Sequence, residues 1–582
     1  MDLATLPSVL AVTDFWMSRW LTPVWFLGVG VTAGLAILAV LIGIFYVMSK
    51  LPFLDDLRKS GAAHIVAAIL TLILAALFTW FMLPTFIEPN GAISRYDELI
   101  LLGIASAIFF GVFSWALMYC SSTRFMLEIK SLLTQGVGLY LLSAVAVVAF
   151  VGLACTPLTE NPSAAFASVP KLFVYGTTLQ PFTVPGAASE EDAPFVKLPV
   201  KYDPNTLAFL QISSTKNLLI GDGPSIAEFR SPGYRVERDV EFRWNRNMGA
   251  AKCPLPLAQG ADVYVQNQEF GDADIRIRIQ SVPPVREATT FVLVAVFTAI
   301  FGLLFMLMQA VSPKTAAIAL ASAKSELSQP LPVILMLIVA LAILLFVFLP
   351  FHTFGEDIKL LKDCGITLIL IAATFQAVWS ASTSVNEEIE GRTALTLLSK
   401  PIHRRSFIIG KMLGVFWVVL FMFVVLGSIE LLAVAYKPIY DARESSLEQP
   451  NWQQCHVEMM QTIPGLAMAF FQAVVLGAIS VALGTRLPLV ANFTICFAIY
   501  LLGHLTPTIV ASAEGGLPLV EFFSQLISAI VPNLNLFSME GAIDADVSIP
   551  WTIISAVLVY TTLYFILATL LGLLLFEDRD LA

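Results

Sequence analysis

Eleven apolar runs restrict what this chain of 582 residues can fold into. A helix of about 20 apolar residues is long enough to cross the roughly 30 Å hydrocarbon core of a bilayer. No Lys or Arg falls inside the runs, and the mean hydropathy of +0.81 agrees with a membrane class. We therefore predict an α-helical polytopic membrane protein with about 11 transmembrane helices. The runs are residues 24–48, 63–83, 99–119, 137–154, 290–311, 330–350, 365–382, 412–436, 462–484, 488–510 and 551–575.

The stretch from residue 155 to residue 289 differs from everything around it. Its first 133 residues, 155–287, hold fifteen acidic and thirteen basic residues, with many Pro and Gly. In residues 275–282 isoleucines alternate with polar side chains, which is typical of a strand with one buried face. Further strands are predicted at residues 171–175, 207–212, 236–244 and 262–265. We expect an inserted, mainly-β domain, such as a small β-sandwich.

The runs and the insert divide the chain into four parts. Residues 1–154 form an N-terminal membrane region with four spans, and the β-rich domain takes residues 155–289. Residues 290–311 are the fifth span, and residues 312–582 hold six more. This last part opens with a weakly amphipathic segment that favours an interfacial helix. Near its end, an apolar helical run in residues 517–537 stops at Pro532.

The densest charge cluster between two spans lies at residues 387–411. Its carboxylates come first, a leucine-rich turn follows, and basic side chains come after Pro401. Proline disfavours helical geometry at the residue before it and has no N–H to donate. The incoming helix should therefore end near Ser399, and the next helix should begin near Ser406. We expect a compact hairpin held at a membrane surface.

The basic residues in the short loops predict the orientation, because cytoplasmic loops carry the excess of Lys and Arg. With the hairpin in the cytoplasm, fourteen basic residues fall in short inside segments and six in short outside segments. We therefore expect a multi-pass protein of the cytoplasmic (inner) membrane. Its N-terminus and β-rich domain would lie outside, and its C-terminus in the cytoplasm. Disulfide pairing and free thiols both remain open for the cysteines that fall outside, namely Cys155, Cys253, Cys364 and Cys455.

The order of residues in the hairpin resembles the signature of type-2 ABC transporter permeases. In that signature an acidic E-x-E-x-x-T-x-x-x-L-L-S-x-P run precedes a basic R-x-x-F-x-x-G-K run. Gly391 departs from the pattern, where the family usually has a longer polar or charged side chain. The resemblance covers about residues 315–582 and implies an elbow helix followed by six spans. The matching residues are Glu388, Glu390, Thr393, Leu397, Leu398, Ser399, Pro401, Arg404, Phe407, Gly410 and Lys411.

This resemblance implies the transmembrane permease subunit of an ATP-driven exporter. Such a subunit depends on a separate ABC ATPase, which binds ATP and Mg, so no cofactor is expected in this chain. A second permease copy is a further implied partner, whereas no nucleic acid is expected. The other interpretation is an ordinary loop whose basic residues set the topology. The residues that would couple the hairpin to the ATPase are Glu387, Glu388, Glu390, Arg392, Thr393, Leu397, Leu398, Ser399, Pro401, Arg404, Arg405, Phe407 and Lys411.

Four polar side chains within the spans are candidates for a transport pathway: Gln376, Ser380, Glu430 and Gln472. Glu430 is the only acidic residue in a span, and carboxylates inside a membrane are functional candidates. It lies within two turns of the interface, however, where a carboxylate can also reach water. Hydrogen bonds that pack one helix against another explain the other three side chains equally well.

Motifs of several enzyme classes are absent from the sequence. No G-x-x-x-x-G-K-[ST] loop is present to cradle phosphates, so the chain should not hydrolyse ATP alone. The strings H-E-x-x-H, G-x-S-x-G and C-x-x-C are also absent. No catalytic residue and no metal site is therefore predicted. An alternative function is a membrane-anchored binding or assembly protein whose extracytoplasmic β domain is the active part.

Overall fold

A computed structural model describes most of the chain. Within the described residues, eleven helices are long and apolar enough to cross a membrane, as the eleven apolar runs predict. The chain divides into two compact units. One comprises residues 1–67, 112–160 and 294–582, and the other comprises residues 68–111 and 161–293. The residues left undescribed are 1–15, 60, 84–95, 135, 174–176, 187–193, 201–206, 222, 230–233, 239, 246–262, 282, 284, 350–355, 385–402, 447, 514–516, 545–548 and 578–582.

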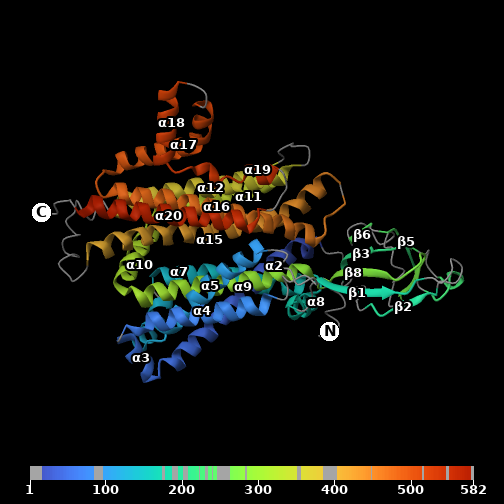
Figure 1. Cartoon of the computed structure of the whole chain (residues 1–582). Coiled ribbons are helices and arrows are strands. Elements are labelled where there is room, and N and C mark those ends of the chain that lie inside the picture. The colour runs from blue at the N-terminus through green and yellow to red at the C-terminus, as the bar shows by residue number, and fades with distance from the viewer. Residues whose placement is uncertain are drawn as a thin grey trace, which may run out of the picture. The chain divides into compact units, whose positions relative to one another are not determined.

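Most of the described chain is helical (Figure 1). Before the β-rich part the main helices are α2 (Trp16–Met48), α3 (Pro52–Lys59), α4 (Ala62–Met82), α5 (Tyr96–Tyr119), α6 (Thr123–Thr134), α7 (Gly136–Ala154) and α8 (Pro162–Ser168). After it come α9 (Thr289–Val311), α10 (Pro313–Leu327), α11 (Pro330–Phe348), α12 (Asp357–Ser382), α15 (Arg404–Glu444), α16 (Trp452–Gly484), α17 (Leu489–Ala513), α18 (Pro518–Ile530), α19 (Glu540–Asp544) and α20 (Trp551–Glu577).

The long helices extend well beyond the apolar runs that predict them. Helix α12 begins at Asp357 instead of residue 365, and α16 begins at Trp452 instead of residue 462. Helix α15 has 41 residues. At about 1.5 Å per residue it is roughly 60 Å long, about twice the thickness of the hydrocarbon core. The predicted boundaries are therefore too short, because polar residues continue these helices.

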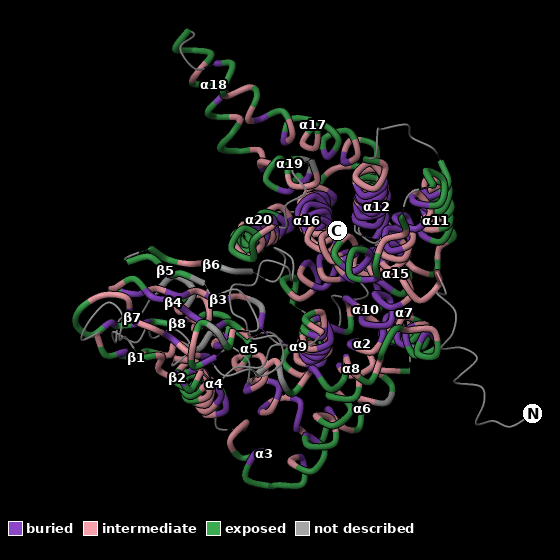
Figure 2. Tube along the Cα trace, turned by 90° about the vertical axis from the view of Figure 1, so that its right-hand side faces the viewer, coloured by how far each residue is buried: buried purple, intermediate pink, exposed green. Residues whose placement is uncertain are grey.

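Helices α12, α15 and α16 form the main core of the membrane part. Their contact is filled by small and β-branched side chains such as Ala373, Val415 and Ala473. Figure 2 shows α12 and α16 largely as buried residues, whereas α17 and α18 are largely exposed or intermediate. These three helices therefore provide the only thoroughly buried spans among those the structure describes.

Helix α10 lies along the first turns of α15. At Gly410 of α15 a side chain would overlap Ile318 of α10, and at Gly414 it would overlap Ser322. The face of α10 that is buried consists largely of alanines, including Ala319 and Ala323. A helix is therefore confirmed where the weakly amphipathic segment predicts one. The apolar run before Pro532 also forms a helix, α18.

Helix α2 belongs to the same compact unit as the long helices. It packs on α7 where Gly28 faces Gly152, and a Cβ atom on either glycine would overlap the Cα atom of the other. Close contact between small residues is a usual way for membrane helices to associate. On another part of α2, Phe26 stacks on Trp452 of α16 with 5.5 Å between ring centroids. Helix α2 therefore joins α7 to the long helices.

The β-rich part of the second unit consists of two four-stranded sheets. One has the order β1-β8-β3-β6 and the other the order β2-β7-β4-β5, with antiparallel pairing throughout. Isoleucines of β8 and valines of β7 share one buried core, which makes the domain a β-sandwich. The strands are β1 (Thr177–Val184), β2 (Val196–Leu198), β3 (Leu207–Ser214), β4 (Leu218–Gly221), β5 (Tyr234–Val236), β6 (Phe242–Asn245), β7 (Val263–Asn267) and β8 (Ala273–Ser281).

Two of the five strand predictions need correction. The prediction of a strand at residues 171–175 is wrong for the part of this segment that the structure describes, because Pro170–Phe173 form a 3-10 helix. The segment 236–244 is not one strand, since β5 ends at Val236 and β6 begins at Phe242. The remaining three predictions coincide with β3, β7 and β8 within two residues at each end.

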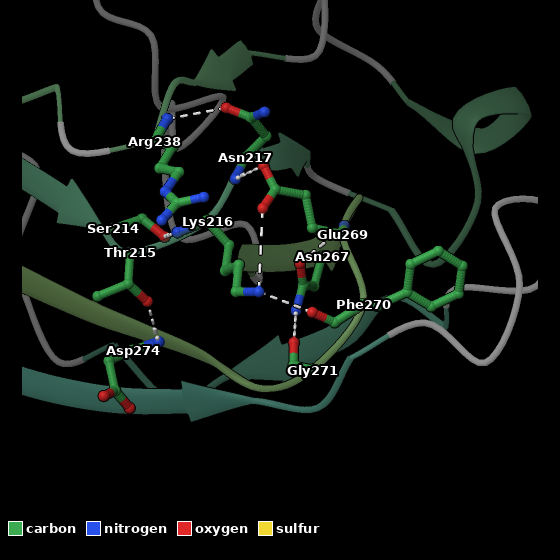
Figure 3. A network of polar contacts seen from close by, with 10 residues as sticks. All are labelled: Ser214, Thr215, Lys216, Asn217, Arg238, Asn267, Glu269, Phe270, Gly271 and Asp274. Atoms are coloured by element: carbon green, nitrogen blue, oxygen red, sulfur yellow. Dashed lines mark hydrogen bonds and ion pairs between the residues drawn. The ribbon is translucent and has the colours of Figure 1, made fainter.

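Loops at one end of the β-sandwich are held together by hydrogen bonds (Figure 3). Lys216, between β3 and β4, donates from Nζ to the carbonyl oxygen of Phe270 at 2.7 Å. The backbone N–H of Asn217 donates to Glu269 Oε1 at 3.2 Å, and that of Arg238 donates to Asn217 Oδ1 at 2.8 Å. These contacts fix three neighbouring loops relative to one another.

Candidate functional site

All four polar side chains predicted as pathway candidates are buried between the helices of the membrane part. Gln376 and Ser380 are fully buried one turn apart on α12. Neither side chain forms a hydrogen bond with any residue that the structure describes. An unsatisfied buried polar group costs about 1–3 kcal/mol. The contact made by α12 is therefore less stable than an apolar contact of the same size.

Glu430, on α15, is also fully buried. Its carboxyl group packs against Gly365 of α12, at a place where any larger side chain would overlap it. Neither carboxyl oxygen has a hydrogen-bond partner among the described residues. The expectation that Glu430 could reach water from near the interface is therefore wrong for this structure. The absence of a side chain at Gly365 is what makes room for the carboxyl group.

Gln472 has a partner on another span. Its Nε2 lies 2.9 Å from His504 Nε2, so the pair connects α16 to α17. The ring of His504 also packs on Tyr500, with 4.8 Å between centroids. Gln472 thus forms a hydrogen bond that packs one helix against another, which is the alternative explanation that the sequence analysis left open for this side chain.

A second polar contact between spans is one that sequence reasoning missed. Asn492 of α17 is fully buried, and its Nδ2 donates to Ser382 Oγ of α12 at 2.8 Å. The same nitrogen reaches the carbonyl oxygen and the hydroxyl of Ser480 of α16, each at 3.0 Å. An asparagine four residues into an apolar run was the available signal. Three helices meet at this one amide.

The extended ends of the long helices bury charged side chains in pairs. Lys362 of α12 donates to Glu458 Oε2 of α16 at 2.5 Å, and only 6% of its side chain is exposed. Lys437 of α15 is fully buried, 2.9 Å from Asp441 Oδ1. Its Nζ also donates to the carbonyl oxygen of Val347 at 3.1 Å. Pairing of this kind is what lets a buried charge persist, and it explains why these helices continue past their apolar runs.

At the other end of α15, the structure places four of the residues predicted to couple to an ATPase. Helix α15 begins at Arg404, two residues before the predicted start. Phe407 is buried and stacks on Phe576 of α20 with 5.6 Å between centroids. Lys411 is 3% exposed, and its Nζ lies 5.7 Å from the centre of the Phe407 ring. Phe407 and Lys411 therefore hold α15 in place, whereas Arg404 and Arg405 are exposed.

The remaining coupling candidates lie outside the described residues. They are Glu387, Glu388, Glu390, Arg392, Thr393, Leu397, Leu398, Ser399 and Pro401. What the structure does describe are the two helices on either side of them, α12 and α15. The pathway candidates Gln376 and Ser380 are on the first of these helices, and Glu430 is on the second.

Cysteine and histidine side chains form no metal site in the described part of the chain, where no three His, Cys, Asp or Glu groups come together. Five cysteines there are free thiols: Cys120, Cys155, Cys364, Cys455 and Cys496. Cys253 lies outside the described residues. No disulfide therefore joins the three described cysteines that were expected on the outside.

Comparison with known proteins gives one family. A family model described as ABC-2 family transporter protein matches residues 284–581, a little over half of the chain. No curated protein and no solved structure matches the chain. The matched region begins just before α9 and ends after α20, so it includes α10, the hairpin and every span that buries the polar groups described above.

Proposed function

The chain belongs to the ABC-2 family of transporter proteins, and we propose that it couples to a separate ABC ATPase through the hairpin at residues 387–411. As a member of this family it is a membrane transport component. Coupling to an ATPase gives that component its source of free energy. The direction we propose is export, away from the side of the membrane on which the hairpin lies.

The observation that carries this proposal is that the family match contains nearly all of the region over which the hairpin signature resembles a permease. The family match covers residues 284–581, and the hairpin signature implies an elbow helix and six spans from about residue 315 onward. Helix α10 occupies the elbow position, and six helices of spanning length follow it. The hairpin signature falls inside the matched region, which supports a coupling role over an ordinary topology-setting loop.

The packing of α15 supports a route for the coupling. Its first turns are held by α10 at Gly410 and by α20 at Phe407. Glu430 lies about seven turns from the start of the same helix, so a shift of α15 along its axis would also displace Glu430. The carboxyl oxygens of Glu430, which lie between α12 and α15, have no hydrogen-bond partner among the described residues, so a shift of that contact breaks no hydrogen bond of this group.

The rest of the assembly follows from this arrangement. ATP and Mg would be bound by the partner ATPase, and two copies of the permease would enclose the pathway. The excess of basic residues on the hairpin side places that side in the cytoplasm of an inner-membrane protein. The N-terminus and the β-sandwich would then lie outside.

Co-purification tests the proposal directly. The full-length chain, tagged after Ala582, would be isolated from its own membranes in mild detergent, and the proteins that remain bound would be sequenced. We expect an ATPase with a G-x-x-x-x-G-K-[ST] loop in near-equal amount, with ATP hydrolysis in the eluate. Recovery of the intact chain without any such ATPase, in detergent and again after cross-linking in the membrane, would refute the coupling.

A further inference from the structure

A pocket lies where the first turn of α15 meets the last turn of α20. It has a volume of about 540 Å³. One side is formed by His403, Arg404, Arg405 and Ser406, and the other by Leu573, Phe576 and Glu577. The pocket thus combines a basic edge with an apolar wall. Its two guanidinium groups outweigh its one carboxylate.

The wall of this pocket is built rigidly. Arg404 donates from Nη1 to the carbonyl oxygen of Glu577 at 2.9 Å. Its guanidinium also lies 6.0 Å from the centre of the Phe576 ring, which is itself almost fully buried. Arg404 is therefore held in one orientation before any ligand arrives, which reduces the entropy that binding would cost.

Arg405 differs from its neighbour. It is exposed, and its guanidinium has no ion-pair or hydrogen-bond partner in the part of the chain that the structure describes. Guanidinium groups bind phosphate through two parallel N–H donors. An exposed arginine beside one that is bonded to the end of α20 gives the pocket the donors that a phosphate group requires.

The position of the pocket limits what kind of phosphate can fill it. Arg404 is the first residue of one spanning helix, and Glu577 is the last residue of another. Glu577 comes two residues after the apolar run of α20, residues 551–575, so the pocket lies near the level at which that run should reach water. Along α20, in the turns before Glu577, the side chains of Leu567, Leu570 and Leu574 are each at least 59% exposed. A soluble phosphate would leave this apolar strip unused, whereas acyl chains would cover it.

We propose that this pocket binds the headgroup of an anionic phospholipid, with the phosphate on Arg404 and Arg405 and the acyl chains along α20. Basic pockets between spanning helices are suited to such headgroups. The lipid would occupy the junction of α15 and α20, in the last part of the hairpin, where α15 begins. The proposal does not depend on an ATPase.

The test uses the full-length chain in detergent without any ATPase. Phosphatidylglycerol and phosphatidylcholine with identical acyl chains would be titrated, and binding followed by native mass spectrometry. We expect phosphatidylglycerol to bind more tightly. Arg405→Gln should weaken it about fivefold, because a basic residue near a membrane surface contributes about 1 kcal/mol to anionic lipid binding.

Arg124→Gln is the matched control. Arg124 lies on α6, is 88% exposed, and is separated from Arg405 by four spans, so it is on the same side of the membrane. It is outside the pocket, and its loss should leave the affinity unchanged. The melting temperature of each variant without lipid confirms that it is folded.

Three results of the lipid titration would overturn the proposal, and a fourth would come from capture of an ATPase. The first is equal affinity for the two lipids, and the second is equal weakening by Arg124→Gln and Arg405→Gln. The third is displacement of bound lipid by inorganic phosphate at similar concentration, which would assign the pocket to a soluble anion. If Arg405→Gln instead weakens only the capture of an ATPase, the pocket is part of a protein interface and the lipid assignment is wrong.

Discussion

Helices α2 and α7 meet in a different way from α12 and α15, although all four belong to one compact unit. The first pair touches backbone to backbone at Gly28 and Gly152. The second pair encloses the carboxyl group of Glu430 against Gly365, with no hydrogen-bond partner for it among the described residues. In both contacts a glycine makes room, but in the first it admits a helix and in the second a polar side chain.

The difference separates a contact between two backbones from one that buries an ionisable side chain. Close backbone packing gains dispersion energy that is lost as soon as the helices part. The contact between α12 and α15 is stabilised by buried apolar side chains, and it also encloses an ionisable group that has no hydrogen-bond partner among the described residues. A carboxyl group inside a span favours a transport role for α12 and α15 over an anchored binding protein, because carboxylates inside a membrane are functional candidates.

The largest effect expected from this comparison is at Gly28. In Gly28→Ala the new methyl group would overlap the backbone of Gly152, so α2 and α7 must separate. We expect a loss of about 3 kcal/mol in the free energy of unfolding, at the upper end of overpacking costs. Thermal or denaturant unfolding in detergent micelles measures it.

Gly43→Ala on the same helix is the control. A Cβ atom at Gly43 meets nothing within 4 Å. Alanine is the better helix former by about 1 kcal/mol, so this variant should be as stable as the wild type or more so. If both alanine variants melt alike, then α2 is not held by the glycine contact and the comparison fails.

A smaller effect is expected at Asn492, the polar contact that joins α12, α16 and α17. Asn492→Leu removes the hydrogen bonds to Ser382 and Ser480. Hydrogen bonds between membrane helices average about 0.6 kcal/mol, so we expect a loss of about 1–2 kcal/mol. Unfolding under the same conditions measures it.

Thr494→Val serves as the reference for Asn492. Thr494 is exposed, and its hydroxyl bonds only to the carbonyl oxygen of Val490 in its own helix. Its replacement should change the free energy of unfolding by less than about 0.5 kcal/mol. Equal losses in the two variants would show that the contact at Asn492 does not join the helices.

The smallest effect on stability is expected at Glu430. Glu430→Gln keeps the size of the side chain and removes only its ability to ionise, so the free energy of unfolding should change by less than about 1 kcal/mol. Substrate-stimulated ATP hydrolysis in reconstituted vesicles should fall, because we propose that this group lies on the pathway. A large loss of stability with unchanged hydrolysis would make Glu430 a structural residue.

The sequence predicts the spans well because each must be apolar over the thickness of a bilayer. It predicts the ends of α12, α15 and α16 poorly, because these continue into water-facing regions where Lys362 and Lys437 are buried against carboxylates. The partners of those lysines are four or more residues away, on the same helix or another. Hydropathy alone cannot detect such pairing.

The candidate site divides along similar lines. Gln376, Ser380, Glu430 and Gln472 could be selected because polar residues are rare in spans. The surroundings of these side chains could not be predicted from the sequence. The space for Glu430, for example, depends on a glycine 65 positions earlier in the chain. In the β-sandwich, β8 is predictable from strict alternation, whereas β2 has three residues and carries no usable period.

The coupling hairpin is tested most directly by one pair of substitutions. Leu398 lies in its leucine-rich turn, and Leu127 of α6 is an 84% exposed leucine on the same side of the membrane, four spans away from the hairpin. The measurement is capture of the partner ATPase by the full-length chain, together with ATP hydrolysis in reconstituted vesicles. We predict that Leu398→Asp weakens capture at least about tenfold, as for the loss of an interface hot spot, and that Leu127→Asp does not. Unchanged capture and hydrolysis in Leu398→Asp would contradict the account and leave the hairpin as a loop that only sets topology.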